Sequence, residues 1–144
     1  MADDIRRCGK SDYPLLAGIW ERSVRATHSF LSEADIVSIR ESLMADCFQA
    51  VELFGAVGAD GSLTGFIGLS GRKIEMLFID SMWIRHGYGS RLIDFAIARG
   101  VLSVDVNEQN PAALKFYLAK GFHMISRDEV DDCGRPFPIL HLSM

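Results

Sequence analysis

The sequence predicts an α+β fold (mixed α/β) in which strands and helices surround a single sheet. Two observations in the pattern support this. Short apolar runs with strand character are separated by amphipathic runs with helical spacing, and the two kinds follow one another without the strict alternation of a doubly wound fold. A third observation is size, because 144 residues with 49% hydrophobic content are enough for one core. We therefore expect one domain over residues 1–144.

The first part of the chain is predicted to hold one strand and two helices. Residues 5–8 read weakly as a strand. Ser11 is expected to cap the first helix, because a serine oxygen can accept a free N–H at a helix start. The apolar stripe of this helix consists of Leu15, Leu16, Ile19, Trp20 and Val24. Ser32 and Asp35 have the spacing of a capping box and predict the start of the second helix.

The middle of the chain reads as a hairpin followed by a strand and a helix. Residues 51–57 and 63–69 are strand-like, and the segment 59–62 between them has the composition of a hairpin turn. The apolar run 74–83 predicts a further strand, and the amphipathic run 91–99 predicts a helix.

The C-terminal part reads as strand, helix and two more strands. Apolar and polar residues alternate over 102–106, which predicts a strand with one polar face. Asn110 is a good N-cap and Pro111 suits the first helical position, while Gly121 favours the stop of this helix. One face of the helix carries Ala113, Leu114, Tyr117 and Leu118.

The last two strands are expected to flank a turn at residues 132–135. Pro136 and Pro138 favour an edge position for the final strand, because proline lacks the N–H that a central strand donates. An exposed edge near residues 137–142 could pair with a second copy, so the chain is expected to be a monomer or a homodimer.

A glycine-containing turn between the strand 74–83 and the helix 91–99 is the most specific local signal. Such a turn leaves several backbone N–H groups aimed at one point at a helix start, which favours a diphosphate. A plain turn that uses glycine for its backbone freedom is the alternative. The residues of the turn are Arg85, His86, Gly87, Tyr88, Gly89 and Ser90.

This turn, the helix and strand after it, and the pattern Asn-x-x-Ala-x-x-x-Tyr-x-x-x-Gly-Phe from Asn110 to Phe122 together resemble the GCN5-related N-acetyltransferases (the GNAT family). The resemblance extends over nearly the whole chain. Within the family, several segments of the chain are similar to a small bacterial acetyltransferase. It implies a twisted, mostly antiparallel sheet of about six to seven strands flanked by about four helices. One position departs from the family, because Ile84 stands where Gln or Arg is usual.

The resemblance implies acetyl-coenzyme A as acetyl donor and a primary amine as acceptor, transferred by direct attack in a ternary complex. The backbone of a strand can pair with the amide-bearing arm of the donor as with another strand. The residues assigned to donor binding are Leu77, Phe78 and Ile79 of that strand, Arg85 to Ser90 of the turn, and Asn107 and Asn110. Asn110 could equally act as a helix cap, and Asn107 could simply form a turn.

The family position of Tyr117 implies a general acid that protonates the departing thiolate. The alternative is a core aromatic residue on a helix face. The acceptor side is assigned to His28, Phe30 and Glu75, and Glu75 could act as a base through a water molecule. For each of these residues an ordinary structural role is the alternative, and the general base is not identifiable. His123 and His141 read as strand residues without partners.

Composition and charge exclude several other classes. The net charge of −4 disfavours a nucleic-acid-binding surface, and with it a toxin-like enzyme that acetylates aminoacyl-transfer RNA. No apolar run reaches the roughly 18 residues of a membrane span, and the histidines lack metal-ligand spacing. Three widely spaced cysteines fit a reducing, cytoplasmic setting. A non-catalytic sensor of acetyl-coenzyme A remains the alternative to a transferase.

Overall fold

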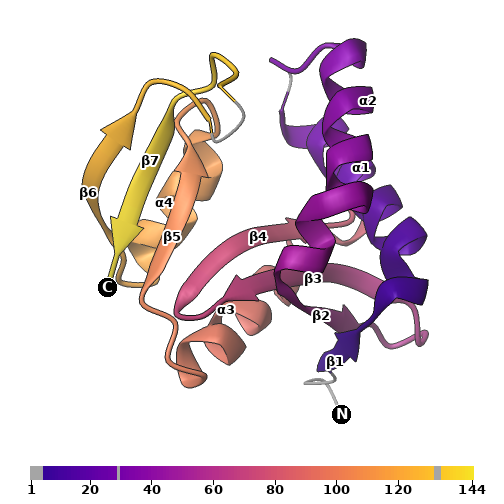
Figure 1. The fold of residues 1–144 in the computed structure, drawn as a ribbon. Helices are drawn as coiled ribbons and strands as arrows, with labels where there is room; N and C mark the ends of the chain where they lie inside the picture. Colours follow the sequence, from indigo (N-terminus) through magenta and orange to yellow (C-terminus); the bar gives the residue numbers. More distant parts are fainter. Residues whose placement is uncertain (1–4, 29, 132–133) are drawn as a thin grey trace.

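The computed structural model describes residues 5–28, 30–131 and 134–144. Among these residues, seven strands form one sheet with the order β1-β2-β3-β4-β5-β7-β6 (Figure 1). The strands are β1 (Ile5–Cys8), β2 (Glu52–Val57), β3 (Leu63–Ser70), β4 (Lys73–Ile79), β5 (Ser103–Asn107), β6 (His123–Asp128) and β7 (Ile139–Ser143). Neighbours are antiparallel except β4 and β5, which run parallel. The predicted mixed, mostly antiparallel sheet is therefore confirmed.

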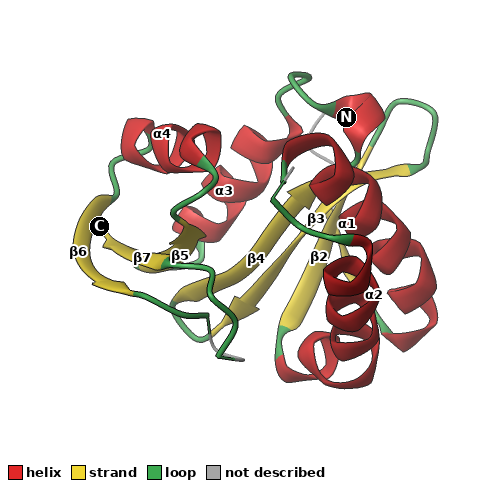
Figure 2. Ribbon diagram, turned by 90° about the horizontal axis from the view of Figure 1, so that it is seen from above, coloured by secondary structure: helices red, strands yellow, loops and turns green. Residues whose placement is uncertain are grey.

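Helices cover both faces of the sheet (Figure 2). The helices are α1 (Tyr13–Thr27), α2 (Glu33–Ser42), α3 (Tyr88–Ala98) and α4 (Pro111–Ala119). Short helical turns at 10–12, 43–50 and 81–83 connect the main elements. Helices α1 and α2 lie on one side, and α3 and α4 on the other, which gives three layers.

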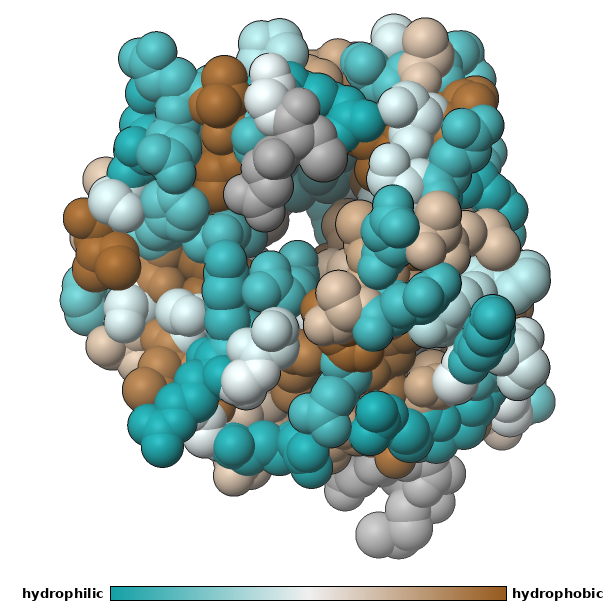
Figure 3. Space-filling view, in the orientation of Figure 1, coloured by the Kyte–Doolittle hydropathy of each residue, from teal (hydrophilic) through white to brown (hydrophobic). Residues whose placement is uncertain are grey.

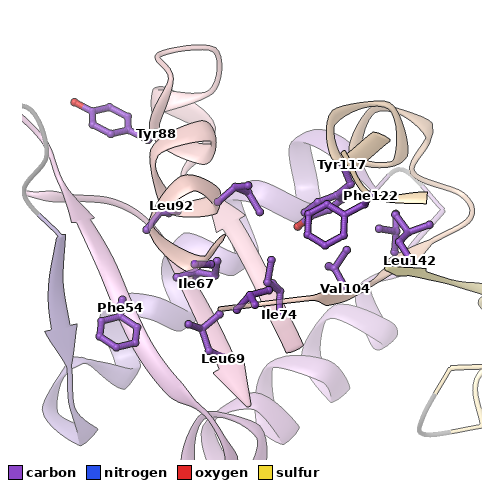
Figure 4. Packing of buried hydrophobic residues seen from close by; sticks show 14 of the residues in the cluster. Phe54, Ile67, Leu69, Ile74, Tyr88, Leu92, Val104, Tyr117, Phe122 and Leu142 are labelled. Atoms are coloured by element: carbon purple, nitrogen blue, oxygen red, sulfur yellow. The ribbon is translucent and has the colours of Figure 1, made fainter. Parts of the chain in front are cut away.

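Each side of the sheet has its own apolar core. Successive side chains of a strand point to opposite faces, so Phe66 of β3 packs with α1 while Ile67 packs with α3, and both are fully buried. The core on the α3 side extends from Phe54 and Leu69 through Ile74 to Phe122 and Leu142 (Figure 4). This core contains Ile74 of β4 and Val104 of β5, which are paired where the two strands meet.

A β-bulge in β4 contributes to the shape of the sheet at this junction. Gly68 of β3 pairs with Met76, and the next residue, Leu69, pairs with Ile74, so Glu75 is an extra residue in β4. A bulge bends its strand and increases the local twist. The β4–β5 pairs of the described residues, Lys73 with Ser103 and Ile74 with Val104, all precede this bulge.

The prediction for the last strand is wrong. The final strand, β7, lies between β5 and β6, and the edge of the sheet is formed by β6. Pro136 and Pro138 precede β7, which begins at Ile139, so they remove no N–H from the ladder. The expected pairing edge near 137–142 is therefore internal. Asp132 and Cys133 of the predicted turn lie outside the described residues.

The helix starts were predicted with mixed success. The capping box is confirmed, because the Asp35 N–H donates to Ser32 Oγ over 3.1 Å and the Ser32 N–H donates to Asp35 Oδ2 over 3.0 Å. Ser11 is not the cap of α1, since that position belongs to Asp12. Leu15 is 47% exposed and stands outside the buried stripe.

The boundaries around the glycine turn also differ from the prediction. Strand β4 ends at Ile79 rather than at residue 83, because a short helical turn takes up Ser81–Trp83. Helix α3 begins at Tyr88 rather than at Arg91, since the residues before Arg91 already have helical geometry. Tyr88, Gly89 and Ser90 are therefore the first turn of the helix.

Candidate active site

A cleft opens where β4 and β5 separate. Among the described residues the two strands pair only at Lys73 with Ser103 and at Ile74 with Val104. Beyond these pairs each strand stays with its outer neighbour, β4 with β3 and β5 with β7. The gap contains a cavity of about 480 Å³, within the range of small-molecule sites. In the space-filling view the surface is hollowed between the half that holds β5 to β7 and the half that holds α1 and α2 (Figure 3).

The first turn of α3 forms one end of this cleft. Gly87 occupies the N-cap position with a left-handed backbone, φ 86°, and no side chain caps this end of the helix. Arg85 also has a positive φ, 69°, an uncommon conformation for a residue with a Cβ. The N–H groups of a helix's first turn have no partner within the helix. Together with the helix dipole, they make this end a favourable place for an anion.

The free edge of β4 forms the wall between the two ends. Leu77, Phe78 and Ile79 are half-buried and pair with β3 on one side only. Because a strand edge presents unpaired N–H and C=O groups, this wall can pair with an extended amide-containing chain. Gly89 of α3 lies beside it, since a Cβ there would be 3.7 Å from Ile79 Cγ1.

Tyr117 lies at the inner end of the cleft on α4. The residue is 6% exposed, and its ring lies beside Phe122 with the hydroxyl directed away from Leu142 (Figure 4). Burial raises the pKa of the Tyr117 phenol. No described group hydrogen-bonds to this hydroxyl, although every fully buried side-chain polar atom in the described residues has a partner. The hydroxyl oxygen is therefore reached from the cavity, and its proton is available to a ligand.

His28, at the C-terminal end of α1, and Asn110, at the N-terminal end of α4, meet at the cleft. The Asn110 Nδ2–H group donates to His28 Nε2 over 3.4 Å, and His28 Nδ1 is 2.7 Å from Thr27 Oγ1. Asn110 also caps α4, because its Oδ1 accepts the Ala113 N–H over 3.2 Å. Burial lowers the pKa of His28. The ring is further held by aromatic contact with Phe30 at 5.3 Å.

A chain of charged side chains crosses the sheet at the base of the cleft. Lys73 Nζ is 2.7 Å from Asp105 Oδ2 and 3.7 Å from Glu75 Oε1. His141 joins the same Asp105 over 2.6 Å and Asp128 over 2.7 Å. The expectation that His141 lacks partners is therefore wrong. The alternation of Ser103 and Asp105 with apolar residues was the available signal, because it predicted a strand with one polar face, but it did not indicate which residue would meet that face.

All the site residues predicted from the sequence except His86 and Phe30 line this one cavity. His86 is exposed and its ring contacts Trp83 at 5.5 Å. Phe30 packs between His28 and Phe137, behind the wall of the cleft. Asn107 lines the cleft and also forms the predicted turn, since its Oδ1 accepts the Gln109 N–H over 2.8 Å.

Several lining residues were not predicted from the sequence. Thr27 and Ser23 belong to the last turns of α1, and nothing local distinguishes them from other helix residues. Ile84 lines the cavity too, but with an apolar side chain. The further unpredicted lining residues include Ile74, Met76, Trp83, Val104, Asp105, Val106, Ala112, Ala113 and Phe116.

The two carboxylates around His141 predict pH-dependent stability. Both ring nitrogens can donate only when the ring is protonated, and the hydrogen bonds to Asp128 and Asp105 raise the pKa of His141 above 6.5. The stabilisation is thus fully present below pH 6.5 and is lost as pH rises through the raised value. We expect the stability difference between wild type and His141→Gln, from urea unfolding at pH 5.5 to 9, to narrow as pH rises. A His123→Gln control should show no such change, and parallel curves for His141→Gln would contradict the prediction.

Two kinds of site are not found among the described residues. No helix there is long and apolar enough to cross a membrane. No three His, Cys, Asp or Glu side chains in the described ranges are arranged to hold a metal ion.

Comparison with known proteins gives consistent matches over almost the whole chain. A family model described as an acetyltransferase (GNAT) domain matches residues 23–138. The peptidyl-lysine N-acetyltransferase YjaB of Salmonella typhimurium strain LT2 is 39% identical over 143 residues, which is 99% of this chain and 98% of that protein. The solution structure of apo-form YjaB from Escherichia coli superimposes with a TM-score of 0.87 at 35% identity, covering 97% of this chain and 95% of the other. A PaiA N-acetyltransferase from Thermoplasma acidophilum in complex with coenzyme A shares the fold, with a TM-score of 0.70 at 21% identity and 98% of each chain covered.

Proposed function

Since the chain belongs to the GCN5-related N-acetyltransferase family, we propose that it moves an acetyl group from acetyl-coenzyme A to a primary amine, most specifically the side chain of a peptidyl lysine. The 39% identical relatives from Salmonella typhimurium and Escherichia coli are peptidyl-lysine N-acetyltransferases, which supports this acceptor. The observation that carries the proposal is the combination of a helix N-terminus, a free strand edge and an unpartnered buried phenol on one cavity.

The residues of the cleft fit the parts of acetyl-coenzyme A in order. The N–H groups of Tyr88, Gly89 and Ser90 would hold the diphosphate at the start of α3, where the helix dipole favours negative charge. The free edge of β4 from Leu77 to Ile79 would pair with the amide-bearing arm. When bound, acetyl-coenzyme A supplies the activated acetyl thioester.

The inner end of the cleft has the groups that acetyl transfer requires. A backbone N–H of Phe78 or Ile79 would stabilise the negative charge that develops on the carbonyl oxygen. Tyr117 would give its proton to the departing sulfur, because its hydroxyl has no partner among the described residues. A direct transfer needs donor and acceptor in the cleft together, and the opening between the two halves of the molecule gives the acceptor a separate approach.

An assay of amine-dependent thiol release tests this proposal. The purified protein is mixed with acetyl-coenzyme A and either a lysine-containing peptide, the same peptide with Arg in place of Lys, or a panel of small primary amines. We expect thiol release and a peptide mass increase of one acetyl group only with the lysine peptide. Release with a small amine alone would overturn the peptide acceptor but keep the transferase. Binding of acetyl-coenzyme A without release by any amine would support the sensor alternative.

A further inference from the structure

The neighbours of His28 determine which of its ring nitrogens carries the proton. At Nδ1 the neighbour is the Thr27 hydroxyl, at 2.7 Å. That hydroxyl has one proton, and it donates this proton to the Ser23 carbonyl oxygen over 2.8 Å. Toward His28 the Thr27 oxygen can therefore only accept, so Nδ1 carries a hydrogen.

The protonation of the other ring nitrogen, Nε2, is determined by Asn110. The Asn110 Oδ1 atom is occupied by the Ala113 N–H of its own helix, which leaves the amide nitrogen facing His28. An amide nitrogen donates and does not accept. Nε2 of His28 therefore carries a lone pair, and the ring is neutral with its basic nitrogen toward the cleft.

We propose that His28 is the general base that takes the proton from the acceptor amine, with Thr27 and Asn110 as positioning residues. This inference rests on the proposed transferase function. His28, the residue just after α1, and Tyr117 on α4 line the same cavity. The 3.4 Å separation between His28 Nε2 and Asn110 Nδ2 is long for a hydrogen bond. An amine N–H at about 2.6–3.2 Å would be the stronger donor to this nitrogen.

The proton balance of the step is complete. The neutral amine nitrogen forms a bond to the carbonyl carbon and gives a proton to His28 Nε2. The bond between that carbon and sulfur breaks, and the sulfur takes the Tyr117 proton. His28 then loses its proton to solvent and Tyr117 regains one, so the products are an amide and a thiol.

Glu75 is a weaker candidate for the same role. It is an exposed residue of the β4 bulge, and Lys73 lies 3.7 Å from its carboxylate. His28 is instead half-buried, and desolvation lowers the pKa of its ring. The neutral, proton-accepting form is therefore available throughout the neutral pH range.

The pH profile of wild type and His28→Gln separates a base from a structural residue. In wild type both the amine and His28 must be neutral, so log kcat/KM for the lysine peptide should rise with a slope of about 2 below the pKa of His28 and about 1 above it. In His28→Gln we expect kcat/KM to fall roughly 10²–10⁴-fold and the slope to stay near 1 throughout. The break should lie below pH 6.5, whereas the pKa of His141 is raised above that value. The other titratable groups on the cavity are Glu75, Arg85, Tyr88, Asp105 and Tyr117.

The following controls distinguish loss of the general base from misfolding and from failure of the proposed transferase function. His123→Gln replaces an exposed histidine of β6 and should retain the wild-type break. Nitrogen-15 NMR of the ligand-free protein should show His28 as the Nδ1–H tautomer, and an Nε2–H tautomer would overturn the inference whatever the activity. Absence of amine-dependent turnover in wild type refutes the proposed function and with it the base. Retention of the break in a folded His28→Gln enzyme refutes the base alone.

Discussion

Replacing Tyr117 with Phe is expected to lower kcat by roughly 10²–10⁴-fold and to leave the affinity for acetyl-coenzyme A within about two-fold. The change removes only the hydroxyl, and the ring contacts with Phe116 and Phe122 remain. Because no described group hydrogen-bonds to this hydroxyl, its removal leaves no partner unsatisfied and should not unfold the protein. Steady-state thiol release and calorimetric titration with acetyl-coenzyme A measure the two quantities.

The dependence of kcat on pH above 8 tests whether Tyr117 acts as a proton donor with a raised pKa. Burial raises the pKa of the phenol above its ordinary value of 10.0, so Tyr117 keeps its proton up to and beyond that pH. Turnover of wild type should therefore not decline below about pH 10 on account of this group. A decline of kcat between pH 8 and 10 that disappears in Tyr117→Phe would contradict the raised pKa.

Tyr13 provides the matched control. It lies at the start of α1 against Phe48, at a ring distance of 5.2 Å, and does not line the cleft. Tyr13→Phe should turn over like wild type. If Tyr117→Phe also did so with the lysine peptide, Tyr117 would have no part in the chemistry and a solvent molecule would have to protonate the sulfur.

Short-range signals in the sequence predicted several helix ends correctly. The capping box at Ser32 and Asp35, the cap at Asn110 and the stop at Gly121, with φ 104°, all concern residues a few positions apart. Such interactions depend on local backbone geometry, so they can be read from the chain directly. The glycine turn belongs to the same class, although the helix after it begins three residues earlier than expected.

Interactions between distant residues were not predictable in the same way. His28 and Asn110 are 82 positions apart, and His141 and Asp105 are 36 apart. Their meeting depends on the order and register of the strands, which the alternation of polar and apolar residues does not determine. Pro136 and Pro138 show the problem, because their effect on strand order depends on whether the strand starts before or after them.

The cleft also depends on interactions between residues that are far apart in the sequence. Among the described residues, the separation of β4 from β5 begins at the bulge at Glu75, beyond which each strand pairs with its outer neighbour. Neither feature has a signature in the local sequence. The resemblance to a known family, rather than periodicity, is what brought the residues of the cleft together in the prediction.

Replacing Ser90 with Glu is expected to have opposite effects on stability and on ligand binding. Ser90 is the third residue of α3, and the helix has no side-chain cap. A carboxylate in the first turn interacts favourably with the helix dipole, so the free energy of unfolding should rise by about 0.3–1 kcal/mol. The same carboxylate would stand where we propose that the diphosphate binds, and juxtaposed like charges cost several kcal/mol. We therefore expect the Kd for coenzyme A, measured by calorimetry, to rise by about 10²-fold or more.

Ser90→Gln separates charge from size, because Gln has nearly the shape of Glu without its charge. If the diphosphate lies at this helix end, Ser90→Gln should bind coenzyme A far more tightly than Ser90→Glu, and the gap should shrink as salt is added, since salt screens the repulsion. Pantetheine, the amide-bearing arm of coenzyme A without the diphosphate, should bind both variants with equal affinity. Equal affinity of the Glu and Gln variants for coenzyme A would instead mean that the anion binds elsewhere, and the free N–H groups of Tyr88 and Gly89 would then have no role in holding the donor.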